Sequence, residues 1–196
     1  MIAWGASVAV FALVMSITPG PNNVLLASSG VRFGLRRSLP QLLGIVLGVS
    51  VMIAVTASGL TAVLTAAPWL QLLLKIGGSA YLLWLAWRLL RTSGIADAVI
   101  ARPLGVWRSA AFQFVNPKAW AMTVGLVSGF LAPGAGYATS TLAAMAIFAA
   151  VQVPSCGVWA VFGAGLRRWL STPRALSIVN RALAGATAAT VLLLWI

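Results

Sequence analysis

The chain has 196 residues, of which 61% are hydrophobic, and a formal net charge of +12. Its only acidic residue is Asp97, and it contains no histidine and a single cysteine, Cys156. A soluble domain carries roughly a quarter charged residues, so this composition excludes an ordinary soluble protein. Without His or Glu the chain cannot assemble a metal-ligand cluster or a pair of catalytic carboxylates. We therefore expect neither an enzyme nor a cofactor-binding protein.

Long stretches without charge predict an all-α integral membrane protein with about six transmembrane helices. The expected helices are 2–31, 39–62, 69–91, 107–131, 138–165 and 175–196. Lys and Arg follow the first, third and fifth of these helices, whereas the segments near Pro68 and Pro133 carry no charge. The positive-inside rule accounts for this pattern without a nucleic-acid partner. It predicts a multi-pass protein of a bacterial inner membrane with both termini in the periplasm.

The stretch 92–106 contains Gly94, Asp97 and Pro103 among mixed residues, which is typical of a loop. We interpret it as a cytoplasmic linker inside a single transmembrane domain that covers 1–196. The linker separates a first repeat, about 1–91, from a second repeat, about 107–196. Three crossings in each half would give the two halves opposite orientations, as in an inverted-topology repeat.

Helix-breaking residues interrupt the first helix of each half. Both breaks lie about ten residues from an arginine expected at the cytoplasmic interface, so at 1.5 Å per residue both are roughly 15 Å deep, near the bilayer centre. Irregular backbone at that depth must be buried in protein or line a cavity. A proline kink without function is the alternative, but two breaks at one depth favour a substrate site. Its candidate residues are Pro19, Gly20, Pro21, Asn22, Asn23, Asn116, Pro117, Lys118 and Trp120.

Lys118 is the candidate for the central charge of this site. Asn116 before Pro117 predicts an N-cap and a first-turn proline, and Asn22 and Asn23 are expected to cap a second restarted helix. The positive ends of both helices would then face the midplane beside Lys118, and an anion such as a carboxylate would bind there. A buried lysine can also release its proton, which arginine practically cannot.

Several residues outside the two breaks have other expected roles. The second lysine, Lys75, lies near the outer end of its helix and is expected to extend to the interface. Hydroxyl groups near the first break lack any base except lysine, which argues against a serine nucleophile. Glycine pairs at Gly44/Gly48 and Gly125/Gly129 predict close helix contacts. Three more residues are candidates for a polar cavity, and the sequence does not show which way their side chains point. They are Gln113, Gln152 and Tyr81.

Five stretches of this sequence resemble the LysE/RhtB family of amino-acid exporters. They are SITPGPNN at 16–23, GVRFG at 30–34, GIVLG at 44–48, GGSAYLLWLAWR at 77–88 and FQFVNPKAW at 112–120. The resemblance covers essentially the whole chain. It implies a six-helix transporter that expels amino acids or their derivatives, with the proton gradient as its energy source.

Many relatives carry an acidic residue just after the glycine that matches Gly48, whereas Val49 and Ser50 follow here. That departure favours neutral substrates such as threonine, homoserine, leucine or cysteine.

The leading hypothesis is a secondary exporter that alternates access around the two breaks. A membrane scaffold that transports nothing is a second reading, although a scaffold has no reason to carry two matched breaks. A small-ion exporter is a third, but the chain lacks the carboxylate and imidazole ligands that divalent ions need. The expected partners are an amino-acid substrate, protons, the lipid bilayer and a second copy of the chain in a homodimer.

Overall fold

The computed structural model describes residues 2–60, 66–91, 103–166, 173–192 and 195, and these residues are almost entirely helical. The expected linker lies mostly outside them. The helices, in chain order, are α1 (Ile2–Ile17), α2 (Pro21–Phe33), α3 (Leu35–Val55), a π-helical turn η1 (Thr56–Leu60), α5 (Pro68–Arg91), α7 (Val106–Gln113), α8 (Pro117–Phe130), α9 (Tyr137–Leu166) and α10 (Pro173–Ala189).

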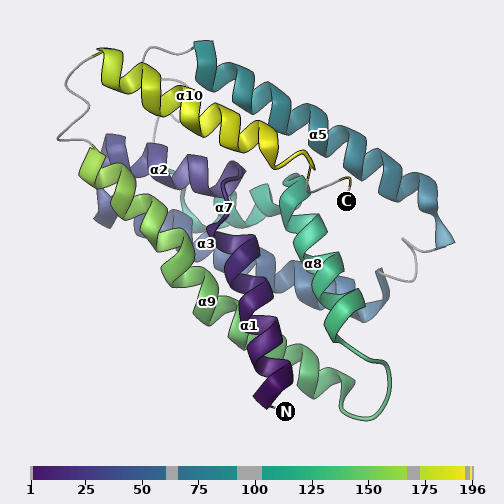
Figure 1. Cartoon of the computed structure of the whole chain (residues 1–196). Coiled ribbons are helices and arrows are strands. Elements are labelled where there is room, and N and C mark those ends of the chain that lie inside the picture. Colours follow the sequence, from purple (N-terminus) through teal and green to yellow (C-terminus); the bar gives the residue numbers. More distant parts are fainter. Residues whose placement is uncertain (1, 61–65, 92–102, 167–172, 193–194, 196) are drawn as a thin grey trace.

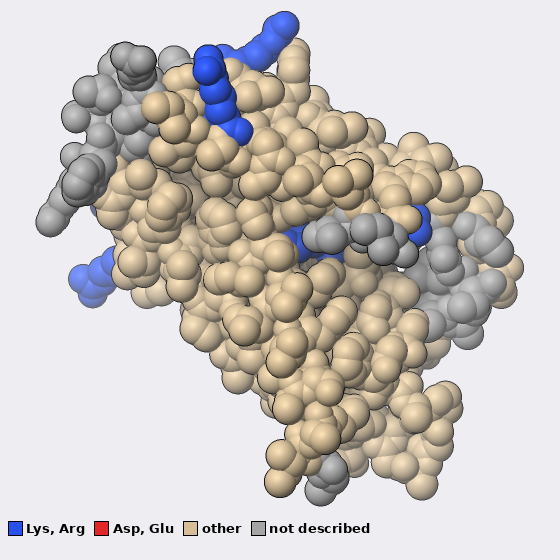
Figure 2. Space-filling view, viewed as in Figure 1, with Lys and Arg blue, Asp and Glu red and all other residues tan. Residues whose placement is uncertain are grey.

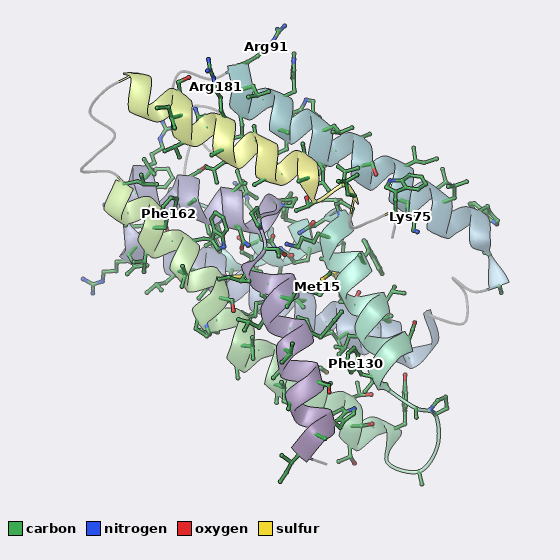
Figure 3. All side chains as sticks on the ribbon, in the orientation of Figure 1. Met15, Lys75, Arg91, Phe130, Phe162 and Arg181 are labelled. Carbon is green, nitrogen blue, oxygen red and sulfur yellow. The ribbon has the colours of Figure 1, made fainter. Side chains whose placement is uncertain are left out.

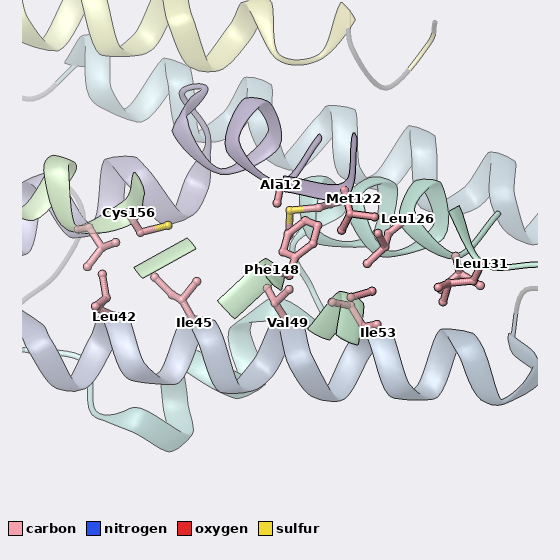
Figure 4. Packing of buried hydrophobic residues seen from close by; sticks show 14 of the residues in the cluster. Ala12, Leu42, Ile45, Val49, Ile53, Met122, Leu126, Leu131, Phe148 and Cys156 are labelled. Atoms are coloured by element: carbon pink, nitrogen blue, oxygen red, sulfur yellow. The ribbon is translucent and has the colours of Figure 1, made fainter. Parts of the chain in front are cut away.

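The largest group of buried apolar residues lies where α1, α3, α8 and α9 meet (Figure 4). Phe148 of α9 fills its middle, next to Ile45 and Val49 of α3 and Met122 of α8. A smaller cluster around Leu89 and Leu183 connects α5, α10 and α2. As a result α5 and α10 lie side by side along one edge of the molecule (Figure 1).

The outer surface is strongly apolar. Large hydrophobic side chains are exposed along nearly every helix, among them Leu13, Leu43, Leu83 and Phe162. In the view of Figure 2 most of the visible Lys and Arg side chains lie at the upper and left margins of a broad uncharged face. Arg91 and Arg181 extend from that upper edge (Figure 3). An exposed apolar surface of this extent suits a lipid environment.

Two helices of the described residues are long and apolar enough to cross a membrane, Leu35–Gly59 and Tyr137–Leu166. The bent pair α1 and α2, whose axes differ by 57°, forms a third such span if it is counted as one. The expected interruption of the first helix is therefore confirmed. The prediction of six crossings in two inverted repeats remains a prediction.

A single glycine changes the expected start of the second helix from 39 to Leu35. Gly34 adopts φ 79°, a left-handed conformation that favours glycine, and its N–H closes α2 by bonding the carbonyl of Gly30. Only Gly34 separates the two helices, and α3 begins at the next residue.

The predicted close contact at Gly44 and Gly48 is confirmed. A Cβ atom at either position would collide with the backbone of α7, at the carbonyls of Val106 and Ala110. The corresponding prediction is confirmed for Gly125, where such an atom would lie 3.3 Å from the ring of Phe11 in α1, and is wrong for Gly129, which has no neighbour within 4 Å of it. The difference follows from the packing, since α3 lies directly against α7.

Candidate functional site

Two breaks in the helices meet at the centre of the site. The first, residues 18–20, separates α1 from α2, and the second, residues 114–116, separates α7 from α8. A proline begins the helix after each break, Pro21 in α2 and Pro117 in α8. Proline fits a first helical turn because the N–H that it lacks would have no helical partner there.

The cap at the second break is as predicted. Asn116 has extended backbone dihedrals, and its side chain accepts a hydrogen bond from the backbone N–H of Lys118 at 3.1 Å. This satisfies one of the free donors at the start of α8.

The expected caps at the first break are wrong. Pro21 is already the first residue of α2, so the cap position falls on Gly20, which has no side chain to offer. Asn22 and Asn23 lie inside the first turn of α2 instead, and their amides are used elsewhere. Asn23 Nδ2 donates to two carbonyl oxygens at the end of α1, those of Ser16 at 2.8 Å and Thr18 at 2.7 Å.

The side chains of Asn22 and Gln113 join the two breaks directly. Asn22 Nδ2 donates to Gln113 Oε1 at 2.8 Å, and Gln113 Nε2 donates back to Asn22 Oδ1 at 3.0 Å. Gln113 Nε2 also donates to the carbonyl of Ser109 at 2.9 Å, and the Gln113 side chain is fully buried. The start of α2 is thus held to the end of α7.

Lys118 crosses from the second break to the first. Its Nζ donates to the Thr18 carbonyl at 2.6 Å, the Thr18 hydroxyl at 2.7 Å and the Pro19 carbonyl at 3.2 Å. An ammonium group has three N–H donors, and these three acceptors use all of them. The charge lies at the carbonyl end of α1, where the helix dipole is negative. Sequence reasoning placed Lys118 beside two positive helix ends, whereas its ammonium group bonds the opposite kind of end.

Gly20 leaves room for this crossing. A Cβ atom built on Gly20 would lie 2.8 Å from Cδ and 3.2 Å from Nζ of Lys118. Any larger residue at position 20 would therefore push the lysine away from the end of α1.

A small cavity lies where the two breaks meet. Its volume open to the centres of water molecules is about 20 Å³, which is room for about one water. Met15, which lines it, lies near the middle of the molecule in Figure 3. The polar residues that line the cavity are Ser16, Asn22, Asn23, Asn116, Lys118 and Gln152, and the other lining residues are Met15, Gly20, Ala119, Met122 and Cys156.

Two buried polar atoms beside this cavity have no hydrogen-bond partner among the described residues. They are Oγ of Ser16 and Oδ1 of Asn23. Buried polar atoms are nearly always bonded, so such atoms beside a cavity indicate where a ligand or water binds. Sequence reasoning named Asn23 both as a candidate site residue and as a cap, and it did not include Ser16 among the site residues. The missed signal is position, since Ser16 falls in the last turn of α1 next to the break.

The remaining candidate residues surround the cavity rather than line it. Pro19 contributes its carbonyl to Lys118, and Pro117 packs against Gly78 of α5. Trp120 is not among the residues that line the cavity, and its indole N–H donates to the carbonyl of Phe114 at 2.8 Å. Among the polar residues left open, Gln152 lines the cavity, while Tyr81 packs against Trp84 and Phe112.

The site combines one ammonium group with neutral amides, hydroxyls and carbonyls. None of the described residues at the site supplies a carboxylate or an imidazole. The amides, hydroxyls and carbonyls can hydrogen-bond a polar molecule, and the ammonium group can pair with an anion.

Comparison with known proteins agrees with this chemistry. The profile of the LysE type translocator family matches residues 13–194. The chain is 35% identical over 123 residues to the cysteine/O-acetylserine efflux protein of Escherichia coli (strain K12), a match that spans 63% of the length of each protein. It is 31% identical over 153 residues to the protein of the same name from Klebsiella pneumoniae, with 78% of each chain covered. No solved structure matches the chain. The chain therefore belongs to the LysE type translocator family, a family of membrane transport proteins and not of enzymes.

Proposed function

We propose that the chain is a secondary transporter that exports amino acids or close derivatives across the bacterial inner membrane. The observation that carries this proposal is the Lys118 ammonium group, which lies in a cavity at the junction of two broken helices. A substrate carboxylate that leaves water needs a paired cation to offset the cost of desolvation. Lys118 supplies that cation.

The charge of the site favours neutral amino acids. A second ammonium group on the substrate, as in lysine, would need a carboxylate of its own, and the only acidic residue of the chain, Asp97, lies outside the described residues. The relatives named above are cysteine/O-acetylserine efflux proteins. Small, neutral, polar amino acids of this kind are the substrates that we propose.

The packing of the helices supports alternating access by two inverted repeats. The breaks at 18–20 and 114–116 occupy corresponding places in the two halves, each just before a helix that starts with proline. In addition, α3 packs against α7 as α9 packs against α1, which are equivalent contacts if the halves are related by pseudo-symmetry. Rocking of one half against the other would expose the cavity to each side of the membrane in turn.

The structure would then represent a closed, empty state. A cavity with room for about one water is too small for an amino acid. Substrate entry therefore requires that Lys118 leave the three acceptors at the end of α1 and that the cavity widen.

Transport measurements in proteoliposomes test the proposal. Purified protein is reconstituted, the vesicles are loaded with one of the twenty amino acids or with O-acetylserine, and counterflow of the labelled compound is recorded. We expect counterflow of at least one small neutral amino acid, and its loss in Lys118→Ala. Lys75→Ala is the matched control, because Lys75 also lies within a helix but contacts Trp195, away from the cavity. Absence of counterflow for the whole panel would show that the protein is not an amino-acid exporter.

A further inference from the structure

Oδ1 of Asn23 has a fixed orientation beside the cavity. Both hydrogen atoms of Asn23 Nδ2 are used, because Nδ2 donates to the carbonyls of Ser16 and Thr18. With both N–H groups bonded, the plane of the amide is fixed, and only its oxygen remains to accept a hydrogen bond. That oxygen is buried, has no partner among the described residues, and belongs to a residue that lines the cavity.

The Ser16 hydroxyl adds a second free acceptor at the same place. Ser16 is 4% exposed and lines the cavity, and its Oγ is also without a partner in the described part of the chain. Asn23 and Ser16 are in contact, since the amide of Asn23 bonds the carbonyl of Ser16. Two residues that touch each other at the carbonyl end of α1 and line the same cavity therefore each carry a free acceptor atom.

The carbonyl groups at that end are the acceptors that Lys118 now uses. Thr18 contributes its carbonyl and its hydroxyl, and Pro19 contributes its carbonyl. The lysine side chain ends in a primary ammonium, which is the same chemical group as the α-ammonium of an amino acid. A set of oxygens that binds one of these groups with short hydrogen bonds has the right chemistry for the other.

We propose that Ser16, Thr18 and Asn23 form a subsite for the α-ammonium group of the substrate, and that Lys118 occupies part of this subsite when the substrate is absent. The inference rests on the proposed function and extends it, since a carboxylate bound to Lys118 alone requires no ammonium group. When the substrate carboxylate pairs with Lys118, the lysine leaves the end of α1. The α-ammonium group then takes the vacated carbonyls together with Oγ of Ser16 and Oδ1 of Asn23.

This exchange explains how the site can bind an ammonium group without an acidic residue. The dipole of α1 places about half a negative charge at its carbonyl end, which stabilises a bound cation. One ammonium group replaces another there, so the number of positive charges at this end stays the same during binding. The subsite should therefore reject molecules that have a carboxylate but lack a free ammonium group.

Competition binding with modified amino acids tests the subsite. Binding of each labelled amino acid of the panel to the detergent-solubilised protein is measured by scintillation proximity. The unlabelled amino acid and its N-acetyl derivative are then compared as competitors that displace the labelled compound. Acetylation removes the positive charge and keeps the carboxylate. We expect the N-acetyl derivative to bind at least about tenfold more weakly, which is the scale of one charge-assisted hydrogen bond.

The variant Ser16→Ala localises the effect. We expect it to weaken binding of the amino acid about tenfold and to leave binding of the N-acetyl derivative unchanged, so that the preference between the two falls about tenfold. Ser155→Ala is the matched control, because Ser155 is equally buried but its hydroxyl bonds the carbonyl of Val151 in its own helix and does not line the cavity.

The two proposals fail in different ways. Binding of no amino acid in the panel would contradict the proposed function and the subsite with it. Equal binding of an amino acid and its N-acetyl derivative would contradict the subsite and leave the exporter intact. A full preference that persists in Ser16→Ala would remove Ser16 from the subsite and overturn the assignment.

Discussion

Asn22 and Gln113 exchange two side-chain hydrogen bonds, and this pair fastens the start of α2 to the end of α7. The two residues lie in different halves of the chain. In an exporter that works by movement of one half against the other, such a pair closes the contact between the halves. Since Asn22 also lines the cavity, the pair lies next to the place where the substrate binds in our proposal.

Our first prediction concerns this pair. Asn22→Ala leaves the buried amide of Gln113 with unsatisfied groups, at a cost of about 1–3 kcal/mol. We expect each of Asn22→Ala and Gln113→Ala to lower the melting temperature of the detergent-solubilised protein by several degrees and to reduce export. The double variant should be little worse than either single one, because both remove the same interaction. Ser140→Ala, which loses only local bonds to the carbonyls of Gly136 and Tyr137, is the control. Additive effects of the two substitutions would show that the pair does not act as a unit.

Our second prediction concerns the charge of Lys118. Lys118→Ala should abolish most export while the protein still folds and inserts, because the substrate carboxylate loses its partner. Lys118→Arg should retain part of the binding and lose turnover, since arginine keeps the charge but is larger and practically never releases a proton. Binding and counterflow are measured on the same preparation. Wild-type transport by Lys118→Ala with unchanged substrate affinity would show that the break is only a kink.

Our third prediction uses Gly20 to displace the lysine without removing it. The methyl group of Gly20→Ala would collide with the flexible side chain of Lys118 and not with backbone, so the fold should tolerate it. We expect a higher rate of substrate entry or a leak, because the lysine no longer closes the end of α1. Gly77→Ala is the control, since Gly77 has open space around it. An unchanged rate in Gly20→Ala would contradict the closing role of Lys118.

The sequence predicted the features that depend on local chemistry. Prolines at positions 19 and 21 required a broken helix, and the order Asn116 and Pro117 required a cap. It missed the roles of Asn22 and Asn23 because Pro21 begins α2 and moves both asparagines into the first turn. A shift of one or two residues separates a cap from an inward-facing amide, and sequence patterns do not resolve helix ends that finely.

Contacts between the two halves were not predictable from the sequence. The bond from Lys118 to Thr18 joins residues 100 positions apart in the chain, and the pair of Asn22 and Gln113 joins residues 91 positions apart. Spacing along one helix gives the depth of a residue but not the helix that it faces. For this reason the sequence indicated a cationic site at the breaks, while the acceptors that hold the cation emerged only from the packing.

Our fourth prediction is the orientation in the membrane. The positive-inside rule places both termini in the periplasm and the stretch 92–106 in the cytoplasm. Single cysteines at Ser7, Ser93 and Ser171, introduced in a Cys156→Ala background, are labelled with an impermeant thiol reagent in intact cells. We expect labelling of Ser7→Cys and protection of the other two. Labelling of Ser93→Cys from outside would reverse the orientation.

Our last prediction concerns energy coupling, and it starts from the lack of acidic residues in the helices. No Asp or Glu lies in the described helices, so the carboxylate that usually carries protons in membrane transporters is missing there. If export is driven by protons, Lys118 must alternate between its charged and neutral forms. The charged form suits both of its partners, the oxygens of Thr18 and Pro19 in the empty state and the carboxylate in the loaded state. Between these states the lysine moves through the cavity without either partner, and there the proton can leave.

Export from proteoliposomes is therefore measured with an imposed pH gradient and again after its collapse. We expect accumulation against a substrate gradient only while the pH gradient lasts, and we expect Lys118→Gln to retain at most downhill exchange. Uphill accumulation that persists in Lys118→Gln would exclude the lysine as proton carrier, and transport that never responds to the pH gradient would identify a facilitator.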